Sequence, residues 1–223
     1  MGFETVTDYL PVPTGAHLLE LRPSGAASTT PAVVSTQQQL DSGVYYTAAG
    51  LGPRAALTAG LFVDGITAPS PGTANVRFVH AAVGAPDVDV TFGANALQFT
   101  DAGFARATPY QPIAAGAYDI GLTGDTGIAL VDSQSVEFTV GVTYTVAAIG
   151  GGGQSVRVLP VVDARAAATL PIGGLATGAG GTADEPVRDA RPWFAVAGAV
   201  AGAVIMVTAT TGAFARSRRA RRS

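Results

Sequence analysis

Alternating apolar and polar residues mark short strands along the first 165 residues of the chain. In the segment 87–92, Val88, Val90 and Phe92 fall on one face and polar residues on the other. A period of two residues is typical of a half-buried β-strand. Shorter patterns predict further strands at 75–80, 117–123, 128–131 and 156–162.

The segment 135–140 alternates in the same way, which places Val136, Phe138 and Val140 on its predicted inner face. A two-residue connection leads to another predicted strand at 143–149, so we expect these two segments to form a hairpin. About seven short strands separated by turns favour an antiparallel β-sandwich, immunoglobulin-like or transthyretin-like. The fold class expected is therefore all-β.

The chain repeats itself after about 100 residues. The segments 43–47 and 62–64 recur at 141–145 and 161–163. Five single positions recur as well: Thr7, Tyr9, Pro11, Gly15 and Leu21 match Thr108, Tyr110, Pro112, Gly116 and Leu122. We therefore expect tandem β-sandwich copies that touch each other little.

The last 31 residues of the sequence predict a membrane anchor. A run of 22 residues from Trp193 to Phe214 carries no charge. As a helix it would reach roughly 33 Å, which is enough to cross a bilayer. Aromatic residues at both of its ends are typical of membrane interfaces. The tail that follows contains five arginines, Arg216, Arg218, Arg219, Arg221 and Arg222.

Arginines beside a span favour the cytoplasmic side, so we expect one transmembrane helix with residues 1–192 outside the cytoplasm. The segment 166–192 is rich in Gly, Ala and Thr and predicts a flexible stalk. Within it, Leu170–Gly174 loosely resembles a signal for attachment to the cell wall. Gly173 takes the place of the required Thr and the motif lies far from the apolar run, so a permanent membrane anchor is favoured.

These patterns divide the chain into six parts. In order they are a truncated first copy (1–66), a linker (67–74), a complete second copy (75–165), the stalk (166–192), the transmembrane helix (193–214) and a cytoplasmic tail (215–223).

The first copy begins at Gly2, the equivalent of Gly103, and so lacks counterparts of the strands predicted within 75–102. Residues 1–10 also lack the basic and apolar parts of a signal peptide. We expect a start further upstream, with about 28 more domain residues and a signal peptide of roughly 20–30 residues. A degenerate half-domain and a strand donated by another molecule are the alternatives.

Composition narrows the function classes. Charged residues make up 13% of the chain, and the net charge is −3. Because the arginines concentrate in the tail, the rest is acidic, which argues against a nucleic-acid-binding surface. The absence of cysteine excludes disulfides, thiolate metal sites and cysteine nucleophiles.

His80, Asp87 and Asp89 are the most suggestive group for chemistry. We expect His80 to form hydrogen bonds at a strand end, because a zinc site needs more ligands than this segment offers. Asp87 and Asp89 share the outer face of their strand, where they form a solvated acidic surface or bind Ca²⁺ together with loop carbonyls. No cofactor is expected.

No nucleophile elbow or zinc-protease motif occurs in the sequence, so we expect a non-catalytic protein. The alternative is an extracellular enzyme, similar to a glycan hydrolase, that uses Asp87 or Asp89. The partners expected are the lipid bilayer and either an envelope glycan or another protein. The tyrosines at matched sites are expected to pack or to form hydrogen bonds at sheet corners: Tyr9, Tyr46, Tyr110, Tyr118 and Tyr144.

The order of motifs in the second copy resembles a known family. VRFVHAA at 76–82 is followed by APDVDV at 85–90, and Phe104 and Tyr110 then follow. This order resembles the family called domain of unknown function 4397, over most of 74–164 and in part over 1–64. The resemblance implies an extracytoplasmic β-sandwich module, often in tandem in bacterial envelope proteins, and implies no catalytic residue.

Overall fold

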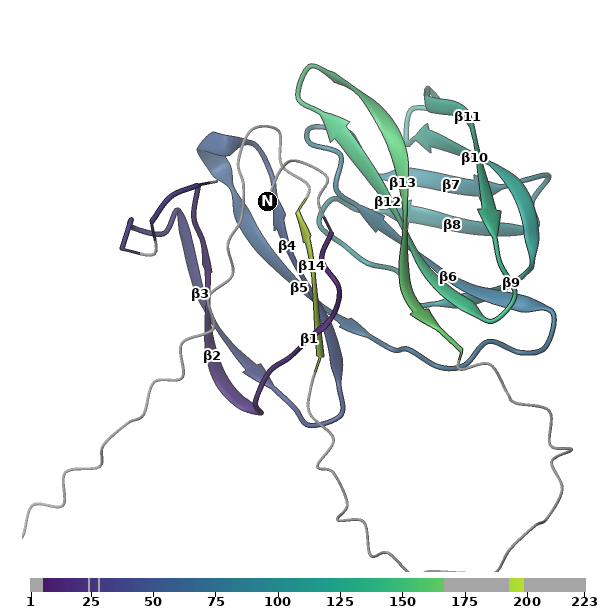
Figure 1. The fold of residues 1–223 in the computed structure, drawn as a ribbon. Coiled ribbons are helices and arrows are strands. Elements are labelled where there is room, and N and C mark those ends of the chain that lie inside the picture. The colour runs from purple at the N-terminus through teal and green to yellow at the C-terminus, as the bar shows by residue number, and fades with distance from the viewer. Residues whose placement is uncertain (1–5, 24, 28, 167–192, 199–223) are drawn as a thin grey trace, which may run out of the picture.

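The computed structural model describes residues 6–166, except 24 and 28, and residues 193–198. Within these ranges the chain is built from strands and one turn of 3-10 helix, η1 (Arg54–Ala56), so the all-β prediction is confirmed (Figure 1).

The second copy is a sandwich of two four-stranded sheets. One sheet has the order β13-β12-β6-β9, and the other has the order β11-β10-β7-β8. The strands are β6 (Thr73–His80), β7 (Val88–Phe92), β8 (Leu97–Ala102), β9 (Gln111–Ala114), β10 (Gly116–Gly124), β11 (Ala129–Phe138), β12 (Val142–Gly151) and β13 (Gln154–Arg165).

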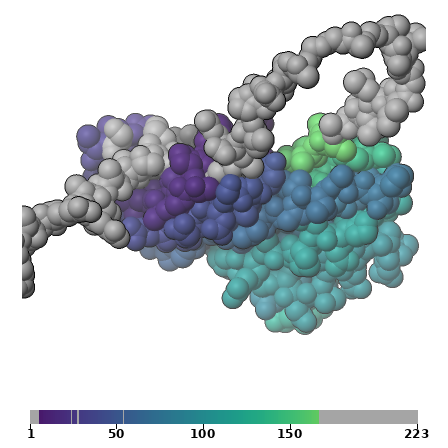
Figure 2. Space-filling model, turned by 90° about the horizontal axis from the view of Figure 1, so that it is seen from below, coloured from purple at the N-terminus to yellow at the C-terminus, as the bar shows by residue number. Residues whose placement is uncertain are grey.

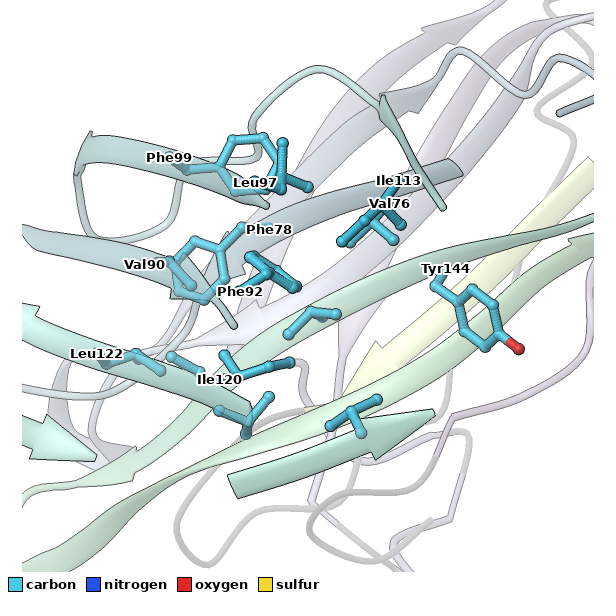
Figure 3. Packing of buried hydrophobic residues seen from close by; sticks show 14 of the residues in the cluster. Val76, Phe78, Val90, Phe92, Leu97, Phe99, Ile113, Ile120, Leu122 and Tyr144 are labelled. Atoms are coloured by element: carbon cyan, nitrogen blue, oxygen red, sulfur yellow. The ribbon is translucent and has the colours of Figure 1, made fainter. Parts of the chain in front are cut away.

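The core of the second copy lies between these sheets. Apolar side chains at alternate positions of both sheets point toward one another (Figure 3). Val76, Phe78 and Tyr144 come from one sheet, and Phe92 and Ile120 come from the other. The apolar positions of the alternating sequence pattern therefore lie on the inner face of each strand.

The predicted hairpin between 135–140 and 143–149 is wrong. β11 pairs with β10, whereas β12 pairs with β13 and β6, so the two segments belong to different sheets. Gly141, with φ of +74°, lets the chain turn from one sheet to the other. Val140 lies in this turn and is 55% exposed, so its predicted inward position is also wrong.

The sandwich is also not purely antiparallel, which corrects the expected fold class. β6 and β12 run parallel as neighbours, with Arg77 opposite Thr145. Parallel neighbours need a long crossover connection, which is usually an α-helix. Here the strands β7 to β11 provide the crossover, because most of them lie in the opposite sheet.

The first copy repeats part of this arrangement. Its sheets have the orders β1-β14-β4-β5 and β2-β3. β2 and β3 pair as β10 and β11 do, and counterparts of β7 and β8 are absent from the described residues. The strands are β1 (Leu10–Pro11), β2 (Gly15–Leu21), β3 (Val34–Leu40), β4 (Tyr45–Leu51), β5 (Thr58–Asp64) and β14 (Trp193–Gly198).

The expectation that the two copies touch little is wrong. Figure 2 shows the first copy, in purple and blue, continuing into the second copy, in blue and teal, as one body. An apolar cluster contains Ala49 and Leu51 of β4 together with Ala81 and Ile149 of the second copy. Strands β4 and β12 are therefore buried on both faces, since one face lies inside a sandwich and the other against the neighbouring copy.

Candidate functional site

A carboxylate with two hydroxyl donors is buried where the first copy meets the second. Asp64, at the end of β5, is 3% exposed. Its Oδ2 accepts a hydrogen bond from the Tyr9 hydroxyl at 2.6 Å and another from the Thr47 hydroxyl at 2.7 Å. Residues from three separate segments of the first copy thus converge on one carboxylate.

The second copy contains the same set. Asp163 Oδ2 accepts hydrogen bonds from the Tyr110 hydroxyl at 2.8 Å and from the Thr145 hydroxyl at 2.7 Å. Each member occupies the position in the repeat that its counterpart has in the first copy. We call the two sets together the paired carboxylate site; its residues are Tyr9, Thr47, Asp64, Tyr110, Thr145 and Asp163.

Arg77 on β6 joins the two sets. Its Nη1 lies 2.6 Å from Asp64 Oδ1, although the two residues belong to different copies. Its Nε donates to Thr145 Oγ1 at 2.7 Å, and its Nη2 donates to Thr47 Oγ1 at 3.2 Å. The guanidinium carbon also lies 4.7 Å from the centre of the Tyr110 ring. A single arginine therefore contacts both halves of the site.

Burial and neighbouring charges shift the pKa values of Asp163 and Arg77. It raises the pKa of Asp163 to about 6, although Arg77 and the hydrogen bonds from Thr145 and Tyr110 act in the opposite direction. Burial is the largest single influence on Arg77 and opposes its charge, but Asp64, Tyr110 and Asp163 together outweigh it, so the pKa of Arg77 is raised. The site thus holds two carboxylates and one permanent cation.

A cavity of about 40 Å³ lies between the two copies next to this site. Asp163 is the one ionisable side chain among the described residues that line it. Matched residues of β4 and β12 line it: Thr47 and Thr145, Ala49 and Ala147, Leu51 and Ile149. The cavity is apolar apart from the hydroxyl and carboxyl groups at one end.

Two segments of the chain match one family model. Residues 1–91 and 83–170 both match the family described as Domain of unknown function (DUF4397). This chain belongs to the DUF4397 family. The double match confirms the tandem copies, although the first match runs past residue 66 and takes in β6. No curated protein matches the chain.

In this DUF4397 chain the predicted group around His80 is structural. The His80 side chain is fully buried, and its Nε2 lies 2.9 Å from the carbonyl oxygen of Pro86. Its Nδ1 accepts a hydrogen bond from the Ala82 N–H at 3.2 Å. Since a carbonyl oxygen can only accept, the proton sits on Nε2 of a neutral ring. Burial also lowers the pKa of His80, which favours this neutral form.

The predicted acidic pair lies apart from the paired carboxylate site. Asp87 is exposed, and Asp89 is half-buried, with Oδ1 accepting from the Asp101 N–H at 3.0 Å. Val88 and Val90 between them face the core, as the alternation predicts. No group of three or more potential metal ligands occurs in the described part of the chain.

The matched tyrosines divide into two kinds. Tyr46 and Tyr144 accept hydrogen bonds from the backbone N–H groups of Asp41 and Thr139, one at each equivalent turn. Tyr118 donates to the carbonyl oxygen of Ala114 at 3.0 Å. The sequence prediction that tyrosines hydrogen-bond at sheet corners holds for these three, whereas Tyr9 and Tyr110 bind the paired carboxylates instead.

The membrane-anchor residues fall largely outside the described residues. Trp193 begins strand β14, so the helix predicted over 193–214 is not observed in its first six residues, 193–198. Phe214 and the arginines 216, 218, 219, 221 and 222 lie outside the described ranges. The described residues include no helix that is long and apolar enough to cross a membrane.

The sequence interpretation missed the paired carboxylate site. Its signal is the recurrence of Asp64 as Asp163, each matched to a recurring Tyr and Thr. A polar residue that recurs inside an apolar strand of a repeat indicates a buried partner, since an unpaired buried carboxylate is costly. Arg77, which has no counterpart in residues 1–66, gave no such signal.

Proposed function

We propose that this DUF4397 chain is a membrane-anchored protein of the bacterial cell envelope. Its two β-sandwich copies form one rigid, non-catalytic body held outside the cell. That body presents a surface to an envelope glycan or to another protein.

The paired carboxylate site supports the non-catalytic part of the proposal. Asp64, Asp163 and Arg77 are all buried. Arg77 contacts Asp64 and Thr47 of the other copy, whereas Asp163 accepts its hydrogen bonds from Tyr110 and Thr145 of its own copy. A catalytic carboxylate needs access to substrate. The observation that carries the proposal is therefore the buried Arg77–Asp64 ion pair, which serves as a structural joint between the two copies.

An open groove supports the binding part. It has a volume of about 490 Å³ and lies between Gly60–Val63 of β5 and the segment 105–109 of the second copy. Both copies contribute to it, so its shape depends on the rigid joint. Val63, on the side of the groove that β5 forms, is 64% exposed. Its side chain therefore offers an apolar contact to a partner.

The uncharged run and the arginine tail support the anchoring part. In the structure, Trp193–Gly198 pairs with β4. The segment 199–214 alone would span only about 24 Å as a helix, less than the bilayer core of about 30 Å. Anchoring by the full run therefore requires Trp193–Gly198 to leave the sheet.

Protease treatment of intact cells tests the topology. Cleavage of the stalk should release a fragment with both copies into the medium and leave the arginine tail with the membrane. A double substitution in the span, Val204→Asp with Val207→Asp, should abolish membrane retention, because charges at the bilayer centre are costly. The matched control, Ala176→Asp with Ala183→Asp in the stalk, should remain in the membrane. Protected copies together with a cleaved tail would overturn the proposal.

The non-catalytic part has its own test. Purified chain is incubated with envelope glycan, and reducing ends are measured for the unmodified protein and for Asp87→Asn with Asp89→Asn. We expect no release in either case. Release that the double substitution abolishes would establish the enzyme alternative.

A further inference from the structure

Strand β14 occupies the position in the first copy that β6 has in the second. β14 pairs parallel with β4, with Trp193 opposite Tyr45 and Gly198 opposite Gly50 (Figure 1). β6 pairs parallel with β12 in the same register, over six residue pairs from Asn75 opposite Thr143. β1 and β9, which flank these strands on the other side, also match.

The two strands differ at the position paired with the threonine of the paired carboxylate site. In β6 this position, opposite Thr145, is Arg77. In β14 the equivalent position, opposite Thr47, is Ala195. Because matched residues of the two copies face each other, Arg77 of one copy reaches Asp64 of the other. An arginine at the Ala195 position would by the same geometry reach Asp163.

Charge and space at Asp163 favour such a group. Asp163 is buried and has no ion-pair partner among the described residues. Asp163 lines the cavity between the copies together with Thr47 and Thr145, and the Thr145 hydroxyl donates to Asp163 Oδ2. A buried carboxylate gains most from a partner that brings both opposite charge and hydrogen-bond donors, as a guanidinium does.

We propose that the edge of β4 is a binding site for an extended segment of a partner polypeptide. The segment pairs parallel with β4 in place of β14 and carries one arginine between apolar residues, as β6 does. Its arginine, opposite Thr47, forms an ion pair with Asp163. Main-chain pairing provides affinity, and the buried charge pair provides selectivity for the arginine.

A peptide with the sequence of residues 73–82, TANVRFVHAA, is the probe. It carries a fluorophore and is titrated against the full chain in detergent micelles. We expect saturable binding, weakened about tenfold or more when methionine replaces the peptide's arginine. Asp163→Asn in the chain should cause a similar loss, and the two changes together should cost little more than either alone. The control Asp125→Asn, at an exposed turn, should bind as the unmodified chain does.

Two further variants locate the site on β4 without changing Asp163. Ala195→Arg supplies the arginine on β14 itself and should weaken peptide binding about tenfold. Ala197→Pro disfavours the pairing of β14 with β4 and should therefore strengthen peptide binding.

The chain has no cysteine, so disulfide cross-linking reports the register. A peptide with cysteine at its Asn75 position should cross-link to Tyr45→Cys and not to Val63→Cys on β5. Equal affinity of the arginine and methionine peptides would overturn the role of Asp163. Saturable binding without the Tyr45→Cys cross-link would overturn the location. Peptide-independent dimerisation that Ala195→Arg abolishes would identify a second copy of this chain as the occupant instead.

Discussion

Arg77 and Asp64 form a buried ion pair between two copies of a repeated domain. Their side chains are 1% and 0% exposed, and Nη1 lies 2.6 Å from Oδ1. A buried pair is stable only when hydrogen bonds satisfy its remaining polar atoms. Here Thr47 and Thr145 accept hydrogen bonds from the guanidinium, and the Tyr110 ring covers it. The pair therefore couples the stability of one copy to that of the other.

Replacing Arg77 tests this coupling. Arg77→Met leaves Asp64 as an unpaired buried charge and should lower the free energy of unfolding by about 3–5 kcal/mol. Adding Asp64→Asn to this variant should restore part of the loss, because the unpaired charge is gone. Urea unfolding followed by circular dichroism measures both effects. The control Arg165→Met, at an exposed position, should change little, and a loss equal to that of Arg77→Met would contradict a specific pair.

Asp163 predicts how stability depends on pH. Its pKa is about 6 in the folded protein, above the value of about 3.9 for an unfolded chain. The folded state thus binds the Asp163 proton more tightly than the unfolded state does. The resulting contribution to the free energy of unfolding is fully present below about pH 4. It is lost as the pH rises to about 6, at a cost on the order of 3 kcal/mol. Urea unfolding at several pH values measures the trend.

The matched variant for this prediction is Asp163→Asn. Relative to the unmodified chain, it should remove the decline in unfolding free energy between about pH 4 and pH 6. Identical pH profiles for the two proteins would assign the decline to another group.

Phe138 tests the core of the second copy. It is 1% exposed and contacts the rings of Phe92, Tyr118 and Tyr144. Phe138→Ala should cost about 3–5 kcal/mol, because a large cavity remains. Val140→Ala, two residues further in the exposed turn, should cost less than about 0.5 kcal/mol. Comparable losses for the two variants, measured by thermal unfolding, would contradict the observed end of β11.

Local pattern predicted much of the fold. The alternation at 87–92 correctly placed Val88, Val90 and Phe92 in the core, since a strand with one buried face records that face in its sequence. The repeat predicted the tandem copies for a similar reason, because equivalent residues serve equivalent contacts. Strand partners were harder: a short turn at Gly141 predicts a hairpin, yet the same turn also allows the chain to change sheets.

The candidate site was not predicted from the sequence, because it is formed by contacts between distant segments that no local pattern indicates. Arg77 reads as one polar residue in an apolar strand, and its partner Asp64 lies in another copy. Strand β14 lies more than 100 residues from β4 in the chain, and its apolar sequence fits a membrane span equally well. Only the three-dimensional arrangement shows that Trp193–Gly198 takes the place beside β4 that β6 has beside β12.

The two proposals together predict competition for Trp193–Gly198, which either pairs with β4 or joins the membrane span. Trp193 is the only tryptophan of the chain, so its fluorescence reports this segment alone. In vesicles with brominated lipids, the 73–82 peptide should displace β14 and increase quenching of Trp193. Ala195→Arg should reduce both the initial quenching and the response, because an arginine paired with Asp163 holds the strand in the sheet. The methionine form of the peptide serves as the control and should have little effect.

Quenching that is strong in every variant and insensitive to the peptide would show that the segment stays in the bilayer and never exchanges with the β4 edge. Peptide binding in micelles without any change in quenching would retain the β4 site and reject the link to anchoring.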